Sequence, residues 1–497
     1  MELETIAMKA LLYLTLAFMF VLLFLIIMVI VMYVVDVTQT KHTIRRNYPV
    51  VGRFRYIFEH MGEFFRQYFF AMDREELPFN RAQRSWVYRA AKDVNRNIAF
   101  GSTRDINVEG TIIFLNSAFP TLTEDATDCL PMVIGPGCEQ PYQANSFFNI
   151  SGMSYGALSK PAVQALSYGA KRANCWLNTG EGGLSDYHLE SGCDIVMQIG
   201  TAKYGVRDEN GNLCDDKLLE KAAHPQVKMF EIKMSQGAKP GKGGILPAHK
   251  VTPEIAKIRG IKPGEASISP NGHPDIRNVS ELLDMITRIR KVTGKPVGFK
   301  AVLGETGWID ELFDLIKQRG LDSAPDFITI DSADGGTGAA PQPLMDYMGL
   351  PIKDTLPWII SHLEGHGLRD RIRVIVSGKM ITPSRVAWAL CMGADFVVSA
   401  RGFMFALGCI QALQCNQNIC PTGITTHNPK LQRGLVSSLK SHRVANYHKL
   451  MVYDVGMIAH SCGVSDPRQL QPKHVHVVSK ENKLVTSQPY THEEVGT

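Results

Sequence analysis

The sequence lacks three features, and each absence excludes or weakens a class of protein. It has no long basic tract, and a formal net charge of +5 over 497 residues does not predict a nucleic-acid partner. Its ten scattered cysteines are too few for a disulfide framework and indicate a reducing compartment. No G-x-G-x-x-G turn follows the first strand, so a doubly wound dinucleotide-binding sheet is the weaker of two α/β interpretations.

One uncharged stretch dominates the N-terminus. Residues 10–35 contain no charged side chain, and at about 1.5 Å per residue they can cross a hydrocarbon core of about 30 Å. A signal peptide would have a shorter apolar region and a small-residue cleavage site, and neither is present. The basic residues that follow are Lys41, Arg45, Arg46, Arg53 and Arg55. The positive-inside rule therefore predicts a single-pass membrane protein whose body lies in the cytoplasm.

The segment after this stretch is rich in arginine, phenylalanine and tyrosine. Residues 54–70 place apolar side chains at helical spacing. This pattern is consistent with an amphipathic helix in the membrane interface and equally with a helix packed on the main domain. We expect an anchor at residues 1–36, a juxtamembrane helical segment at 37–100, a barrel at 101–460 and a tail at 461–497.

Short apolar runs recur eight times in the body, with helical patterns between most of them. The runs are Phe147–Ser151, Cys175–Thr179, Asp194–Ile199, Met229–Met234, Val297–Val302, Phe327–Asp331, Arg373–Ser377 and Phe396–Ala400. The clearest helical patterns are Lys160–Arg172, Val279–Val292, Asp310–Arg319 and Pro383–Met392. Near-continuous apolar strands alternating with helices predict a parallel sheet, and eight units predict a (β/α)8 TIM barrel. Its active site would lie at the C-terminal ends of the strands.

Several strand ends carry residues suited to binding. The Gly-Gly-Thr-Gly loop at 335–338 can approach a phosphate closely, and glycines follow the next two strands. A tight turn explains any one glycine, but three consecutive glycine-bearing ends favour a phosphorylated cofactor. Lys300 lies either against a flavin ring or in an ion pair inside the barrel. Lys233, Gln236 and Arg259 together suit a dicarboxylate, whereas each alone is more simply a structural salt bridge.

Three cysteines stand close together at C-x5-C-x4-C, with a proline after the last. Cys409, Cys415 and Cys420 are soft ligands that suit iron or zinc. Zinc would need a fourth ligand, which His427 could supply. An iron–sulfur cluster with three cysteine ligands fits the spacing better. The alternative is that all three are buried small hydrophobic residues.

Five motifs together resemble the FMN-binding synthase domain of glutamate synthase. They are SGMSYGALS (151–159), NTGEGG (178–183), IKMSQGAKPGKGGILPAHKV (232–251), DGGTGAAP (334–341) and GCIQALQCNQNICPTGI (408–424). The similarity covers roughly residues 145–430, in the family's order. It implies a barrel that carries FMN and a [3Fe-4S] cluster, condenses 2-oxoglutarate with ammonia, and reduces 2-iminoglutarate to L-glutamate.

The resemblance also implies roles for individual residues. Cys409, Cys415 and Cys420 match the cluster ligands. Lys233, Gln236 and Arg259 match residues that hold 2-oxoglutarate, and Glu181 matches a glutamate at the substrate site, so Glu181 and Lys233 are the candidate catalytic residues. The positions that fall around FMN in the family are Met153, Ser154, Lys300, Gly335, Gly336, Thr337, Gly338, Gly378, Arg401 and Gly402.

The chain departs from the family pattern in several places. Residues 200–206 read GTAKYGV where the family has Ser-Gly-Arg-Phe-Gly, although Thr201 keeps a hydroxyl at the substrate site and Lys203 keeps a charge. Asp331-Ser332-Ala333 replaces Ser-Gly-His, and ARGF replaces GTA after the eighth strand. No N-terminal nucleophilic cysteine, dinucleotide fingerprint or further C-terminal domain is present. We therefore expect this polypeptide neither to hydrolyse glutamine nor to take electrons directly from NADPH.

The sequence thus predicts a membrane-anchored glutamate synthase-like oxidoreductase. Its expected partners are 2-oxoglutarate, ammonia or a small amine, and an external electron donor such as a ferredoxin-like protein or a separate reductase. An amidotransferase and a second copy of the chain are further candidates. Two alternatives stay open: an N-alkylglutamate synthase that uses methylamine, and a membrane-attached flavin and iron–sulfur electron-transfer module.

Overall fold

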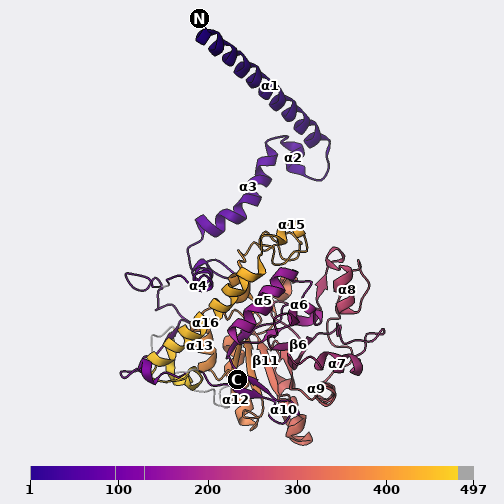
Figure 1. The fold of residues 1–497 in the computed structure, drawn as a ribbon, viewed down its shortest axis with the longest axis vertical. Helices are drawn as coiled ribbons and strands as arrows, with labels where there is room; N and C mark the ends of the chain where they lie inside the picture. Colours follow the sequence, from indigo (N-terminus) through magenta and orange to yellow (C-terminus); the bar gives the residue numbers. More distant parts are fainter. Residues whose placement is uncertain (1, 96, 128, 480–497) are drawn as a thin grey trace. The chain divides into compact units, whose positions relative to one another are not determined.

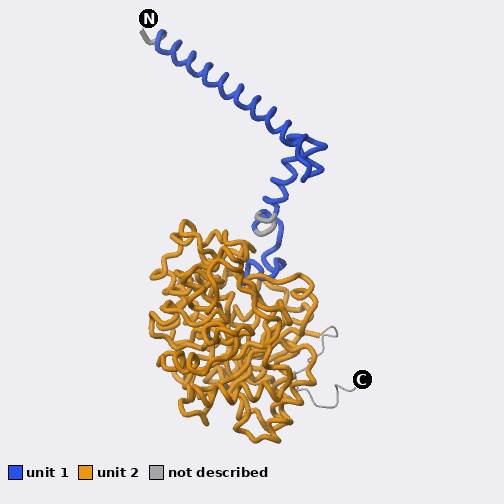
Figure 2. Tube along the Cα trace, turned by 90° about the vertical axis from the view of Figure 1, so that its right-hand side faces the viewer, with its two compact units in different colours: residues 1–83 blue, residues 84–497 orange. Residues whose placement is uncertain are grey.

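The computed structural model describes residues 2–95, 97–127 and 129–479. It divides into two compact units, residues 1–83 and residues 84–497 (Figure 2). The last part of the expected tail, residues 480–497, lies outside the described residues.

The first unit is built from helices. They are α1 (Glu2–Thr38), α2 (Thr43–Asn47), α3 (Gly52–Phe65), the π-helical turn η1 (Arg66–Phe70) and the start of α4 (Arg81–Ala91). Within α1, residues 5–38 form a candidate membrane span by length and composition alone. None of the residues in its most apolar window is buried. The expected span at 10–35 therefore corresponds to one continuous apolar helix.

The second unit contains the predicted barrel, which confirms the fold. Eight parallel strands close in the order β10-β11-β12-β13-β4-β5-β6-β7, so the first and last strands of the barrel pair with their neighbours to complete the ring. The strands are β4 (Phe148–Ile150), β5 (Leu177–Asn178), β6 (Ile195–Ile199), β7 (Val227–Lys233), β10 (Val297–Ala301), β11 (Phe327–Asp331), β12 (Arg373–Ser377) and β13 (Phe396–Ser399). Each lies within or beside one of the eight predicted runs.

The helices of the second unit include all four that were predicted. These four are α5 (Lys160–Ala173), α9 (Val279–Thr293), α10 (Gly307–Arg319) and α13 (Pro383–Cys391). The others are α6 (Asp186–Leu189), α7 (Asp215–Ala222), α8 (Pro253–Arg259), α11 (Gln342–Tyr347), α12 (Ile352–Gly365), α14 (Arg401–Leu407), α15 (Pro429–Gln432) and α16 (Ser437–Ser461). The boundaries have local causes: the Ser159 side chain accepts a hydrogen bond from Ala162 N at the start of α5, and Gly294 ends α9 in the left-handed region.

A short hairpin covers the N-terminal end of the barrel. Strands β2 (Met132–Ile134) and β3 (Tyr142–Ala144) pair antiparallel just before the first barrel strand. Tyr142 packs edge-on against Trp176, and Trp176 lies against Phe396, with ring centroids 6.2 and 5.2 Å apart. All three rings are buried, and each large side chain removed from water contributes roughly 1.5–3 kcal/mol. The active end of the barrel is therefore the opposite one.

The body extends beyond the expected end of the barrel. Helix α16 runs along α5 (Figure 1), and this close approach requires a glycine, because a Cβ at Gly169 would meet the side chain of Val444. After α16, strand β14 (Val475–Val477) pairs antiparallel with β1 (Ile112–Phe114). Residues 461–477, which we expected in the tail, thus contribute secondary structure to the second unit. A further small pair, β8 (Ile245–Leu246) and β9 (Ser267–Ile268), lies near the site described next.

Candidate active site

A cavity of about 380 Å³ opens at the C-terminal ends of the barrel strands. Thirteen of the predicted site residues line it: Met153, Ser154, Glu181, Lys233, Gln236, Arg259, Lys300, Gly336, Thr337, Gly338, Gly378, Arg401 and Cys415. These residues come from segments more than 250 positions apart. The barrel therefore brings the predicted substrate and cofactor residues around one space.

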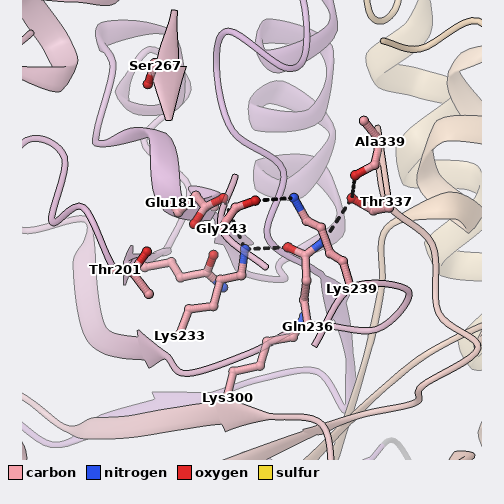
Figure 3. Close-up of polar contacts among 12 residues, drawn as sticks. Glu181, Thr201, Lys233, Gln236, Lys239, Gly243, Ser267, Lys300, Thr337 and Ala339 are labelled. Carbon is pink, nitrogen blue, oxygen red and sulfur yellow. Dashed lines mark hydrogen bonds and ion pairs between the residues drawn. The ribbon is translucent and has the colours of Figure 1, made fainter. Parts of the chain in front are cut away.

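A chain of polar contacts crosses this cavity (Figure 3). Glu181 lies on the short 3-10 turn Gly180–Gly182 after β5, and its Oε1 is 3.2 Å from Nζ of Lys233 at the end of β7. Lys233 Nζ also contacts the amide oxygen of Gln236. Gln236 Nε2 in turn donates to Thr337 Oγ1 at 2.9 Å. The contacts link three strand ends, so moving one side chain would disturb the others.

Two glycines that we did not predict enclose the Glu181 carboxylate. A Cβ at Gly200 would lie 2.6 Å from Oε2, and a Cβ at Gly244 would collide with Oε1. Burial alone would raise the pKa of Glu181, but the ammonium groups of Lys233 and Lys239 lower it below its usual value. The site therefore holds a carboxylate anion beside the lysine that we expect to bind substrate.

Arg259 reaches the cavity from the last turn of α8. Its Nη1 donates to Ser267 Oγ at 3.1 Å, and its guanidinium lies 5.0 Å from the ring centroid of Tyr204. The side chain is buried, and its Nε has no hydrogen-bond partner among the described residues. A buried donor without a partner costs free energy. A carboxylate ligand would relieve that cost and fit the fork of the guanidinium.

Lys300 forms the floor of the cavity together with an acidic pair. Its Nζ is 3.1 Å from Asp331 Oδ2, and the same oxygen accepts a hydrogen bond from Gly237 N at 2.9 Å. Burial alone would lower the pKa of Lys300, but the carboxylates of Asp331 and Glu231 raise it. The ion pair that we expected as one alternative is thus present, while the contact of Lys300 with a flavin ring stays a prediction for a lysine that lines the cavity.

Beneath this floor, Glu231 is the centre of a buried network that the sequence did not reveal. Its carboxylate accepts hydrogen bonds from Asn178 Nδ2 at 2.8 Å, Gln198 Nε2 at 2.7 Å and Thr329 Oγ1 at 2.6 Å. Glu231 and Lys233 are two residues apart on β7, so both side chains point to the inside of the barrel. That period-two placement was the signal that could have identified it.

The cavity wall at the ends of the last strands combines glycines, which expose main-chain atoms, with positively charged side chains. Gly378 has a φ of +116°, a conformation that side chains rarely adopt. A Cβ at Gly336 would lie 2.7 Å from Nε of Arg401, whose guanidinium contacts the Thr337 carbonyl. Lys379 lines the same wall. Exposed backbone next to two cations suits a phosphate group.

Five predicted site residues do not line the cavity, namely Thr201, Gly335, Gly402 and the cysteines Cys409 and Cys420. The Thr201 hydroxyl donates to the Pro270 carbonyl at 2.7 Å, so it supports a loop. Gly335 packs against Gly237, with its own Cβ position 3.6 Å from the Gly237 Cα. At Gly402 a Cβ would collide with the Tyr447 hydroxyl and lie 2.8 Å from Ser399 Oγ. The positions of Gly335 and Gly402 thus have packing explanations, while their cofactor roles stay predictions.

The three cysteines lie on one irregular loop beside the cavity. Cys415 lines the cavity, whereas Cys409 and Cys420 do not. The Lys250 ammonium fastens the loop by donating to the carbonyls of Cys415 at 3.0 Å and Thr425 at 2.9 Å. Among the described residues, no three His, Cys, Asp or Glu side chains form a group ready to hold a metal ion.

His427 does not complete a zinc site in this arrangement. Its Nε2 lies 2.8 Å from the Gly156 carbonyl, so this ring nitrogen is engaged with the backbone. Burial also raises the pKa of the Cys409 thiol to about 11. At Cys420, burial alone would raise the pKa, but hydrogen bonds from Thr422 and Thr425 lower it. The loop therefore presents thiols in unequal environments.

Comparison with known proteins identifies the family. Residues 115–465 match the conserved region in glutamate synthase. The glutamate synthase large subunit-like protein YerD of Bacillus subtilis (strain 168) is 39% identical, with 94% of this chain and 95% of that protein covered. An archaeal NADPH glutamate synthase of Methanocaldococcus jannaschii is 33% identical over 65% of this chain and 60% of that enzyme. A mutant flavocytochrome b2 structure gives a TM-score of 0.47 at 14% identity over 82% of each chain.

The family match spans the barrel and its strand ends, where the described cavity lies, and the match to YerD extends over nearly all of the chain. The chain spans about three fifths of the archaeal enzyme's length but nearly the whole of YerD. Since the conserved region covers residues 115–465, this protein belongs to the glutamate synthase family of oxidoreductases.

Proposed function

We propose that this protein forms L-glutamate from 2-oxoglutarate and ammonia. The observation that carries the proposal is the convergence of Glu181, Lys233, Gln236 and Arg259 on one cavity whose floor is Lys300. A dicarboxylate needs two cationic ends, and an electron relay needs none. The cavity therefore favours an enzyme over a flavin and iron–sulfur relay module.

The residues present fit FMN. The loop at 336–338, Gly378, Lys379 and Arg401 would hold its phosphate through backbone and positive charge, and Met153 and Ser154 line the same cavity. The buried Lys300 ammonium would lie against its ring system, where a cation stabilises the reduced anion. When bound, FMN would supply the hydride that reduces the imino carbon.

The chain's own residues would bind and orient the substrate. Arg259 and Lys233 would hold the two carboxylates, and Gln236 would fix the 2-oxo end by a hydrogen bond. Condensation with ammonia releases water and gives the imine. Lys233 Nζ lies between Glu181 and Gln236, and in this proposal it would hold the proton that accompanies the hydride. Orientation of this kind can contribute several kcal/mol to catalysis.

We further propose that Cys409, Cys415 and Cys420 hold a [3Fe-4S] cluster. Three thiolates on one loop are the soft donor set that such a cluster requires. The loop would have to bring its sulfur atoms together when the cluster assembles. The electrons would come from an external donor, a ferredoxin-like protein or a separate reductase. The ammonia would be free or supplied by an amidotransferase partner.

We also propose that α1 anchors the protein in the membrane as a single span. Residues 5–38 would rise about 50 Å at 1.5 Å each, and the uncharged stretch 10–35 within them about 39 Å, so both exceed a hydrocarbon core of about 30 Å and allow a tilt. The five cations that follow would place the body in the cytoplasm.

The test is an anaerobic stopped-flow experiment with the purified flavoprotein. The flavin is first reduced chemically and then mixed with 2-oxoglutarate plus ammonium. Reoxidation that requires both reagents, with L-glutamate as product, would support the proposal. Faster reoxidation with methylamine would favour an N-alkylglutamate synthase. No response to any 2-oxo acid and amine would favour the electron-transfer module.

A further inference from the structure

A cluster of polar side chains joins the end of the long apolar helix α1 to the segment that follows it. The Asp36 carboxylate is fully buried. It accepts hydrogen bonds from Arg45 Nη2 at 2.8 Å, from Arg53 Nε at 2.8 Å and from the backbone N–H of Val50 at 3.0 Å. Two guanidinium groups and one carboxylate form charge-assisted bonds, which are the strong ones. The cluster therefore fixes the start of α3 to the last turn of α1.

This cluster occupies one side of α3. Arg53 and Tyr56 are three residues apart and so share a face of the helix. Arg53 binds Asp36, and the Tyr56 ring packs edge-on against His42, with ring centroids 5.2 Å apart. The polar side of α3 is thus turned toward the end of α1.

The other side of α3 is apolar and exposed. Phe54, Phe58, Met61 and Phe65 follow one another at intervals of four, three and four residues, which places them on one stripe of the helix. Their exposed fractions are 54, 65, 37 and 37%. The Phe65 ring lies 5.5 Å from that of Phe69, which is also exposed, so the apolar surface continues into η1. A contiguous apolar surface of this kind marks an interaction site.

The charge around this surface has one sign. Residues 39–58 contain five lysines and arginines and no aspartate or glutamate. Asp36 neutralises part of that charge, while Lys41, Arg46 and Arg55 are available to anionic groups. Lysine and arginine side chains near an anionic membrane surface are attracted to it by its negative surface potential. Positive charge beside an apolar stripe is the combination that binds an interface of anionic lipid.

We propose that α3 is a second, interfacial membrane attachment. Its apolar stripe, Phe54, Phe58, Met61 and Phe65, lies at the boundary between the headgroups and acyl chains of an anionic lipid leaflet. The Asp36 cluster sets the face of α3 that meets the lipid. This inference rests on the proposed span, because α1 brings α3 to the bilayer. The occupant is the lipid surface, and neither the barrel body nor a second copy of the chain.

The test uses the full-length protein in vesicles that contain phosphatidylglycerol. The photoreactive residue p-benzoylphenylalanine replaces one side chain at a time, as Phe58→p-benzoylphenylalanine, its neighbour Glu59→p-benzoylphenylalanine and, within α1, Leu22→p-benzoylphenylalanine. Phe58 and Glu59 are both exposed and lie about 100° apart around the helix. After illumination, mass spectrometry measures cross-linked lipid in each variant.

We expect lipid adducts at position 58 and at position 22, with a yield at 59 lower by about five-fold or more because that position is turned toward water. Equal yields at 58 and 59, or a position-58 adduct with protein instead of lipid, would overturn the interfacial helix. Loss of the position-22 adduct would overturn the span itself, so the two failures are distinguishable. Intact mass of the extracted protein shows whether α1 is retained.

Two further measurements test the roles of charge and of the cluster. Replacing phosphatidylglycerol with phosphatidylcholine should lower the lipid yield at 58 and leave the yield at 22 unchanged. Adding Asp36→Asn should act in the same direction, because the clamp on Arg45 and Arg53 is lost. A yield at 58 that is indifferent to lipid charge would contradict the anionic surface. A yield at 58 that is indifferent to Asp36→Asn would contradict the clamp.

Discussion

The Glu181 carboxylate lies 3.2 Å from the Lys233 ammonium, and its far oxygen faces the backbone of Gly200 closely enough to exclude any side chain there. The carboxylate is thus held between a lysine and a glycine. A substitution at the glycine should displace Glu181 without removing a charge.

Gly200→Ala should therefore impair catalysis while leaving the fold intact. A Cβ at this position would lie 2.6 Å from Glu181 Oε2, so the carboxylate must move and Lys233 must move with it. We expect kcat/KM to fall by about 10- to 100-fold, the effect of misplacing a catalytic group by roughly 1 Å. Gly272→Ala is the matched control, since a Cβ there meets nothing within 4 Å. Equal activity of both variants would show that the position of Glu181 does not matter for catalysis.

Arg259→Lys should weaken 2-oxoglutarate binding and leave the flavin spectrum unchanged. An ammonium cannot reproduce the two parallel hydrogen bonds of a guanidinium, and the loss should be on the order of 1.5–3 kcal/mol. Lys233→Ala should act in the same direction and be non-additive with Arg259→Lys if both residues hold one ligand. Titration of 2-oxoglutarate against flavin absorbance measures both. Unchanged affinity in both variants would favour the electron-transfer module.

Cys415→Ser should abolish the proposed cluster, because serine is a poor ligand for a soft iron site. Anaerobically purified wild-type protein should contain three irons per chain, and the variant should contain none. Cys391→Ser is the control, as this buried cysteine lies on α13, away from the loop. Zinc, or no metal, in the wild-type protein would rule out the cluster.

Gly169→Ala should destabilise the body by about 1–3 kcal/mol, the usual cost of overpacking. The new methyl group would collide with Val444 where α5 and α16 cross. Gly456→Ala, also on α16, is the control. The nearest side-chain atom would be 3.7 Å away, and alanine is the better helix former by about 1 kcal/mol. Thermal melting should separate the two variants in opposite directions.

Acid should destabilise the body between pH 6.5 and pH 4. Burial lowers the pKa of His188 and His448 to about 4, while each titrates near 6.5 when unfolded. Between these values the unfolded chain binds more protons, so stability is full above pH 6.5 and is lost as pH falls toward 4. Each histidine should account for roughly 3 kcal/mol of that loss. His448→Gln should reduce the pH dependence of the melting temperature, and an unchanged dependence would contradict this assignment.

The sequence predicted the barrel well because local patterns set its elements. Each of the eight apolar runs is short, nearly continuous and close to a turn residue, so strand positions follow from local composition. The carboxyl ends of parallel strands meet at one edge, and this rule alone places Lys233, Lys300 and Gly378 together. Thirteen of the predicted site residues line one cavity for that reason.

The sequence did not reveal features that depend on contacts between distant segments. Helix α16 has no clear apolar stripe, because it packs against several neighbours at once. The pairing of β1 with β14 joins two three-residue strands that carry no signal alone. Glycine is required at positions 200 and 244 because the Glu181 carboxylate lies between them, and no local sequence pattern predicts that contact.

The pairing of β1 with β14 has a consequence for the order in which the body can fold during synthesis. Strand β1 is complete at Phe114, yet its partner begins only at Val475. The first barrel strand, β4, likewise waits for β13 at Phe396–Ser399 before the ring can close. The intervening chain that must leave the ribosome is 360 residues for the first pair (115–474) and 245 residues for the second (151–395). A nascent chain stalled before α16 should therefore expose an open sheet edge to chaperones and proteases.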